Sequence, residues 1–195
     1  MRKFLTTVLI IILQGCVPHS DTPLTDPDEN LIDTSILGTW FWQEENETGY
    51  LHIGLDEESK LLRVIMLDID GHKKLDESEY SGHTSELHGN RYLNLKWVRP
   101  VQDEITGYML IKYTTTADSL GIAFMDKKVV ETAVIEGSLK GIVKKDEKFA
   151  AVRITDGQKE LQDFILQKDN ELFTGMKYMQ KLNLPEFKYG ESSVD

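Results

Sequence analysis

The feature that most constrains the fold is a series of short apolar or alternating runs, separated by turn residues, that begins at Ile36. In residues 49–55 the apolar residues Leu51, Ile53 and Leu55 fall on one face of an extended chain. Short strands at regular spacing are typical of an antiparallel barrel or sandwich. The predicted strands are residues 36–43, 49–55, 61–69, 77–87, 91–98, 108–116 and 120–125.

The period of the apolar residues changes after the seventh of these strands. Residues 126–139 carry apolar residues at helical spacing, and Gly141 is the predicted stop. One more strand is predicted at 149–154, and Thr155 is the predicted N-cap of a second helix that ends near Lys168. The prediction is therefore a mainly β chain of eight antiparallel strands, with one inserted helix and a C-terminal helix.

The N-terminus has the plan of a secretory signal peptide. Arg2 and Lys3 precede a mostly apolar stretch at 4–13, which is too short to cross a bilayer because a spanning helix needs about 20 apolar residues. The stretch ends in Leu13-Gln14-Gly15-Cys16, and Cys16 is the only cysteine of the chain.

These residues resemble the lipobox of bacterial lipoproteins, in which an aliphatic residue, a tolerant position and a small residue precede an obligatory cysteine. The resemblance implies cleavage before Cys16 and lipid on its thiol and often its amine, so the expected partner is a membrane. Val17 rather than an aspartate follows the cysteine, which favours an outer-membrane anchor with the domain facing the periplasm. A Gram-positive host, with the anchor in the plasma membrane, stays open.

These motifs divide the chain into four parts. Residues 1–15 are the predicted lipoprotein signal peptide, and residues 16–35 the predicted lipidated cysteine and flexible tether, rich in proline, aspartate, serine and threonine. Residues 36–185 are the predicted barrel domain, and 186–195 a loose tail.

Composition excludes two classes of function. The 195 residues include 22 Lys and Arg against 33 Asp and Glu, for a formal net charge of −11. Such a chain lacks the basic surface that phosphate binding needs, so no nucleic-acid partner is predicted. A single cysteine allows neither an intramolecular disulfide nor a multi-cysteine zinc site.

The first predicted strand contains Gly38-Thr39-Trp40. Together with the strand layout, this G-x-W motif is similar to that of the lipocalins and the wider calycin group. The resemblance implies an eight-stranded barrel closed at one end by Trp40, with an arginine from the last strand, here Arg153, lying across the indole. The T-D-Y-like turn of the family is absent at 116–119, so another barrel or sandwich and an α+β sheet remain alternatives.

Three residues are candidates for ligand binding. Trp42 lies two residues after Trp40 and shares its face on a strand. Arg63 lies within an apolar strand, where it either meets a ligand anion or faces solvent beside an acidic residue. Tyr108 is a candidate for orienting a polar head group. An eight-stranded barrel has room either for a filled core or for a small ligand.

The histidines predict neither metal binding nor catalysis. His83 and His88 are five residues apart, so a regular strand places them on opposite faces. His83 and Ser85 share a face, but no nucleophile elbow accompanies them. Asp68-Ile69-Asp70-Gly71 fits a hairpin turn better than a calcium loop.

No enzyme, metal or cofactor is therefore predicted. The expected function is binding or carriage of a small hydrophobic or amphipathic ligand by an anchored barrel. The alternative is a non-catalytic envelope protein with a filled barrel that docks a partner protein.

Overall fold

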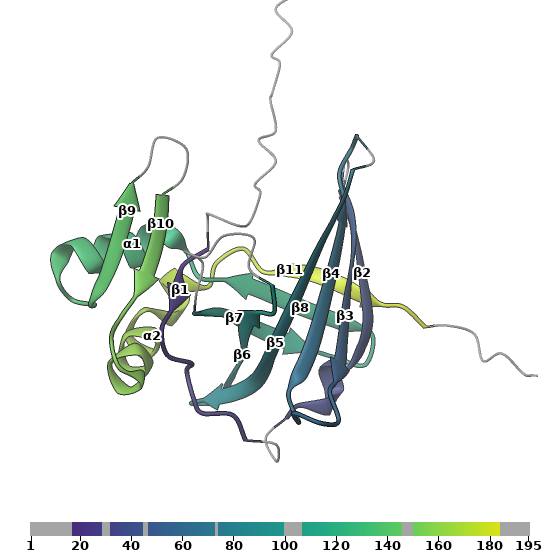
Figure 1. The fold of residues 1–195 in the computed structure, drawn as a ribbon, viewed down its shortest axis with the longest axis horizontal. Coiled ribbons are helices and arrows are strands. Elements are labelled where there is room, and N and C mark those ends of the chain that lie inside the picture. Colours follow the sequence, from purple (N-terminus) through teal and green to yellow (C-terminus); the bar gives the residue numbers. More distant parts are fainter. Residues whose placement is uncertain are drawn as a thin grey trace, which may run out of the picture.

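The computed structural model describes residues 17–28, 32–44, 47–72, 74–99, 107–145 and 150–183 (Figure 1). Eight of its strands form a closed antiparallel barrel in the order β2-β3-β4-β5-β6-β7-β8-β11, in which β6 also pairs with β7 and β11 with β2. The strands are β1 His19–Ser20, β2 Gly38–Glu44, β3 Glu47–Leu55, β4 Leu62–Ile69, β5 Leu75–Leu87, β6 Asn90–Trp97, β7 Tyr108–Thr115, β8 Ser119–Phe124, β9 Gly141–Lys145, β10 Ala150–Ile154 and β11 Lys177–Lys181.

The predicted barrel of a lipocalin-like type is thus confirmed, but its eighth strand lies elsewhere in the sequence. The predicted strand at 149–154 forms as β10, which pairs with β9 and β1 outside the barrel. The barrel is closed instead by β11, which pairs with β8 and β2. The interior core receives one residue from β11, Met179, and the short stretch Lys-Tyr-Met-Gln-Lys is too weak a pattern to predict a strand.

Both helices lie between β8 and β11 in the sequence. The helix α1 (Lys127–Glu136) begins at Asp126, whose carboxylate accepts hydrogen bonds from the backbone of Lys128 and Val129. It ends at Gly137, which has a φ of 77°, rather than at the predicted Gly141, because a left-handed C-cap favours glycine. The helix α2 (Gln158–Leu172) begins after Gly157 rather than Thr155 and continues past Lys168.

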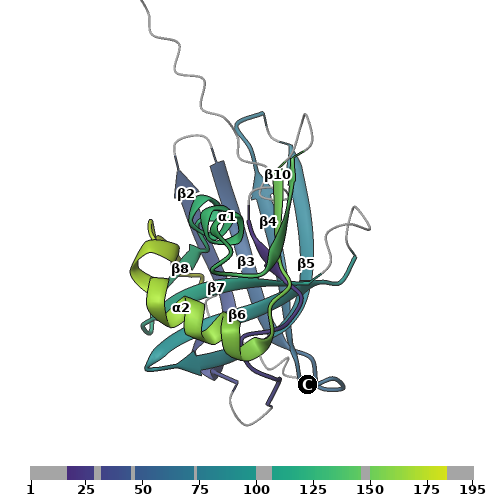
Figure 2. The same ribbon diagram turned by 90° about the vertical axis from the view of Figure 1, so that its left-hand side faces the viewer.

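The helices cover one side of the barrel (Figure 2). A second apolar cluster fills the space between them and the outer faces of β6, β7 and β8. Its members from the barrel are Tyr92, Leu110 and Ala123, and its helical members include Val130, Leu161 and Ile165. The outward-facing side chains of Tyr92, Leu110 and Ala123 are therefore buried.

The N-terminal segment is not the predicted flexible tether. Val17, His19, Ser20 and Leu24 are buried, and Leu24 is fully enclosed. The strand β1 pairs with β7 on one side and with β10 on the other. Residues 17–28 and 32–35 therefore pack as part of the barrel domain, since burial of these side chains and strand pairing hold them there.

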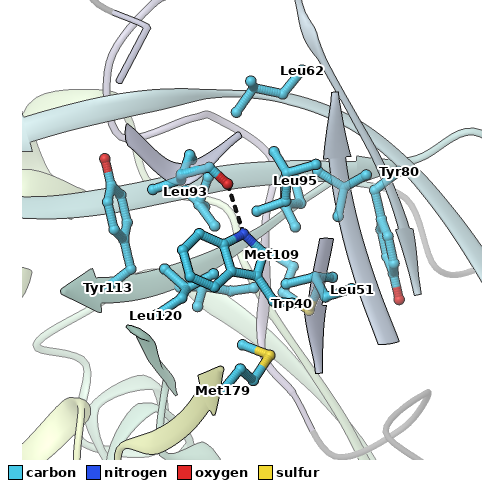
Figure 3. Close-up of a cluster of buried hydrophobic side chains, with 14 of the residues drawn as sticks. Trp40, Leu51, Leu62, Tyr80, Leu93, Leu95, Met109, Tyr113, Leu120 and Met179 are labelled. Carbon is cyan, nitrogen blue, oxygen red and sulfur yellow. Dashed lines mark hydrogen bonds between the residues drawn. The ribbon is translucent and has the colours of Figure 1, made fainter. Parts of the chain in front are cut away.

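One end of the barrel is plugged. We call this end the closed end. It is the end at which β3 is connected to β4, β5 to β6 and β7 to β8. The short helix η3 (Thr34–Ile36) lies there, and the indole N–H of Trp40 donates to the carbonyl of Ile36 at 2.8 Å (Figure 3). The fully or almost fully enclosed side chains of the interior are Ile36, Trp40, Ile53, Leu62, Val64, Leu93, Tyr113 and Leu120.

A polar cluster holds η3 in place. The Asp33 carboxylate caps η3 through Ser35 and accepts hydrogen bonds from Arg91 at 2.9 Å and from the Tyr113 hydroxyl at 3.0 Å. Burial opposes ionisation of Asp33, but these hydrogen bonds prevail and lower the pKa of its carboxyl below the ordinary value. Burial and the nearby Asp33 charge raise the pKa of Tyr113, which therefore stays a hydrogen-bond donor.

Candidate functional site

Trp40, the tryptophan of the G-x-W motif, is fully buried near the closed end, and the cation beside it is not the expected one. The Nζ atom of Lys181 lies 5.0 Å from the centre of the Trp40 ring. Arg153 on β10 is instead paired with Asp21, the residue that follows β1. The prediction for Arg153 was wrong because its strand is not the last strand of the barrel, and the cation comes from β11, which is.

The other end of the barrel carries the candidate site. We call it the mouth, the end at which β2 is connected to β3, β4 to β5 and β6 to β7. Four apolar side chains near this end pack against the interior core but are only partly buried. This mouth ring consists of Trp42, Met66, Trp97 and Phe124.

The Trp42 indole lies over its cross-strand neighbour. It pairs with Gly49, and a Cβ atom placed on Gly49 would come within 1.9 Å of the Trp42 ring. The glycine therefore leaves the space that the indole occupies. As predicted, Trp42 shares the inward face of Trp40, since both pack in the interior cluster.

Trp97 lies on the far wall against Tyr80, with ring centres 4.4 Å apart. Burial raises the pKa of the Tyr80 phenol to about 12, so the ring stays uncharged at neutral pH. The sequence already placed Trp97 on one face with Leu93 and Leu95. Met66 and Phe124 gave no such signal, because their inward position follows only from the register of the strands.

Carboxylates lie above the mouth ring. Asp68 pairs with Gly49 on one side and Asp76 on the other, and antiparallel partners point to the same face of a sheet. Partial burial, followed by repulsion from Glu47 and Asp76, raises the pKa of the Asp68 carboxyl. The ammonium of Lys177 is 3.2 Å from a carboxylate oxygen of Glu44, and it offsets part of this negative charge.

The mouth also contains a buried histidine, His19. His19 pairs with Met109, a member of the interior cluster, so its side chain points to the inward face. The ring is 9% exposed, and its Nε2 atom has no hydrogen-bond partner within the part of the chain that the structure describes. Burial lowers its pKa, against a hydrogen bond with the Val17 backbone, which leaves a neutral imidazole with one free polar atom.

The side chains of two predicted ligand residues point outward from the barrel. Arg63 is exposed and donates from Nε to Glu79 at 2.8 Å, as the solvent-facing alternative required. Tyr108 packs with the outer cluster, where Lys96 Nζ lies 5.8 Å from its ring centre. Both predictions of ligand binding in the interior were wrong, because strand register turns these residues outward.

The buried polar residues on the outer face of β5 hold the N-terminal segment. His83 Nε2 lies 2.7 Å from the carbonyl oxygen of Thr25, and Ser85 Oγ lies 2.6 Å from Thr25 Oγ1. Asn94 Oδ1 accepts from the Leu24 amide at 2.6 Å, while its Nδ2 donates to Ser85. His83 and Ser85 share a face as predicted, and their polar atoms are engaged in these contacts.

Two other residues that the sequence singled out lie in turns between strands. His88 is exposed in the turn between β5 and β6, and Asp70 caps the turn between β4 and β5. Within the described ranges, no three His, Cys, Asp or Glu residues are grouped so as to hold a metal ion. No helix in the same ranges is long and apolar enough to cross a membrane. Cys16 and residues 186–195 lie outside the described residues.

Comparisons with known proteins identify no relative of the chain. No family model matches the chain, and no curated protein and no solved structure is significantly similar to it. The interpretation of the site therefore depends on the residues themselves.

Proposed function

We propose that the chain is a bacterial lipoprotein, attached through Cys16 to the outer membrane, whose periplasmic barrel binds or carries a small hydrophobic or amphipathic ligand. The observation that carries the binding proposal is the contrast within the barrel interior. The most deeply enclosed side chains, among them Trp40, Leu62 and Leu120, lie toward the closed end, whereas Trp42, Met66, Trp97 and Phe124 at the mouth are only partly buried.

The mouth suits the apolar part of such a ligand. Covering partly exposed apolar surface contributes roughly 25 cal/mol per Å². Two indoles provide large, rigid contact areas, and aromatic residues of this kind dominate binding energies. The filled closed end restricts the ligand to the mouth, so a short acyl chain or a compact ring system fits better than a long chain.

Polar groups at the mouth determine which polar head group a ligand can carry. The free Nε2 atom of His19 needs a hydrogen-bond donor, because an unsatisfied buried polar atom is costly. The carboxylates around Asp68 disfavour an anionic head and favour a hydroxyl or an ammonium. The preferred ligand is therefore neutral or cationic at its polar end.

A titration with the uncharged fluorophore N-phenyl-1-naphthylamine tests the site. We expect Trp42→Ala to weaken binding about ten-fold, which corresponds to about 1.4 kcal/mol. Phe41→Ala is the matched control, since Phe41 neighbours Trp42 on β2 but packs against Tyr50 at a ring distance of 5.3 Å. Equal affinities for both variants and the unaltered protein would reject the mouth as the binding site.

Identification of the natural ligand needs a separate measurement. The domain from Val17 onward, secreted into a bacterial periplasm and purified gently, is extracted with organic solvent and the extract examined by mass spectrometry. A stoichiometric amphiphile with a neutral or cationic head supports the proposal. An extract without one shifts the weight to the second candidate.

The second candidate is a non-catalytic envelope protein that docks a partner. The observation that favours it is the packing of the closed end, together with a shallow groove of about 260 Å³ between α1 and α2. Val129, Ala133 and Phe164 contribute apolar surface to the groove, and Lys128, Glu136, Lys168 and Glu171 contribute charge. Loss of partner capture on Ala133→Glu, with binding of the fluorophore unchanged, would support this candidate.

A further inference from the structure

The position of the N-terminal segment determines how an anchored barrel would be oriented, an inference that rests on the proposed lipidation of Cys16. Consecutive Cα atoms are 3.8 Å apart across a trans peptide bond. Val17 is 6% exposed and packs in the interior cluster. A lipid on Cys16 would therefore be attached one residue before a packed side chain, without an intervening tether.

The packed segment is at the mouth. His19 and Ser20 pair with Met109 and Tyr108, the residues with which β7 begins at the mouth end. The strand β1 lies between β7 and β10, on the side of the barrel from which the helices extend (Figure 1). The acyl chains would thus emerge beside the mouth rather than beside the closed end.

Several contacts prevent this segment from lengthening into a tether. The Asp21 amide donates to the Ile154 carbonyl at 2.9 Å, and the Asp21 carboxylate is paired with Arg153. Farther along, the buried contacts of Leu24 and Thr25 with Asn94 and His83 fix the chain to β5 and β6. Release would expose Val17 and Leu24 and break these hydrogen bonds together.

Exposed apolar residues lie at the same end. Leu75 begins β5 and is 58% exposed, and Val98 follows β6 and is 45% exposed. Apolar side chains at a membrane interface gain free energy by entering the boundary between head groups and acyl chains. The carboxylates near Asp68 are repelled by anionic head groups, so this end suits a zwitterionic lipid surface.

We propose that the mouth of the barrel faces and contacts the bilayer that holds the anchor, with Leu75 and Val98 as contact residues. A ligand then passes between bilayer and mouth without crossing bulk water. The closed end, with the plug formed by η3, faces away from the membrane.

Photo-crosslinking of the full chain tests this orientation. The lipidated protein is placed in vesicles of phosphatidylcholine and phosphatidylethanolamine, with p-benzoylphenylalanine replacing Leu75 or Val98. Leu55 and Leu182 are the matched control positions, since they are 44% and 43% exposed at the closed end. We expect lipid adducts from the mouth positions to exceed those from the control positions about ten-fold, because interfacial contact is confined to a few ångströms.

A second variant separates orientation from anchoring. A flexible glycine–serine insertion of about 20 residues between Cys16 and Val17 reaches roughly 25 Å and should abolish the difference between the two ends. Equal adduct yields from both ends of the lipidated protein without the insertion would overturn the orientation alone. An unmodified Cys16, detected by mass spectrometry of the purified chain, would overturn the anchor of the proposed function and this inference with it.

Discussion

The two ends of the barrel are built from the same strands but differ in the hydrogen bonding of their carboxylates and in the burial of their apolar side chains. At the closed end Asp33 accepts hydrogen bonds from Ser35, Arg91 and Tyr113, and Ile36 and Trp40 are fully enclosed. At the mouth Asp68 lies among other carboxylates, and Trp42 and Trp97 keep part of their surface exposed. The difference indicates that the closed end stabilises the fold, whereas the mouth keeps apolar surface exposed, as the proposed binding site requires.

The largest effect should come from the enclosed tryptophan. Trp40→Ala removes a fully buried indole and its bond to Ile36, and is expected to lower the free energy of unfolding by about 3–5 kcal/mol. Trp42→Ala at the mouth should cost only about 1–2 kcal/mol, since its indole is partly exposed. Urea denaturation of both variants measures the contrast, and equal losses would contradict it.

The packed N-terminal segment predicts the next effect. Asn94→Ala leaves the buried Leu24 amide without its acceptor and removes one of the two contacts of the Ser85 hydroxyl, and is expected to cost about 2–3 kcal/mol. Hydrogen exchange of the Leu24 amide should accelerate at the same time. A variant with unchanged stability and slow exchange would show that the segment is held by other contacts.

The two carboxylates should respond to pH with opposite signs. Because the pKa of Asp33 is lowered on folding, its contribution is present above the unfolded pKa and is lost as pH falls through the folded one. Asp33→Asn should therefore destabilise the protein at pH 7 by about 1–2 kcal/mol, and progressively less towards acid pH. Urea midpoints between pH 7 and pH 3 measure this convergence.

Asp68 is the opposite case. Burial and neighbouring carboxylates raise its pKa on folding, so ionisation opposes folding as pH rises through and above the unfolded value. Asp68→Asn should stabilise the protein slightly at pH 7, and the gain should vanish in acid. A loss of stability at pH 7 would mean that the Asp68 charge is paired rather than repelled.

The smallest effect is expected at the predicted ligand residue that faces solvent. Arg63→Ala removes an exposed ion pair with Glu79, and should change stability by less than about 0.5 kcal/mol. Binding of the fluorophore should stay unchanged within error. Weaker binding would place the ligand on the outer wall instead of in the mouth.

The sequence by itself determined the elements that have strong local signals. Alternation predicted seven of the barrel strands, and Gly38 and Trp40 indicated which type of barrel they form. Asp126 was followed by helical periodicity, and α1 begins there. These predictions succeeded because apolar periodicity reports directly which side chains a strand or helix can bury.

Only the tertiary structure decided which strand closes the barrel and which face each polar residue takes. The pattern of β11 is too polar to be recognised, so Lys181 rather than Arg153 lies over Trp40. Shifting strand register by one residue exchanges the two faces, and this placed Arg63 and Tyr108 outside. The segment after Cys16 looks like a tether in composition, yet side chains far away in sequence, Asn94 and His83, bind its backbone and turn it into part of the domain.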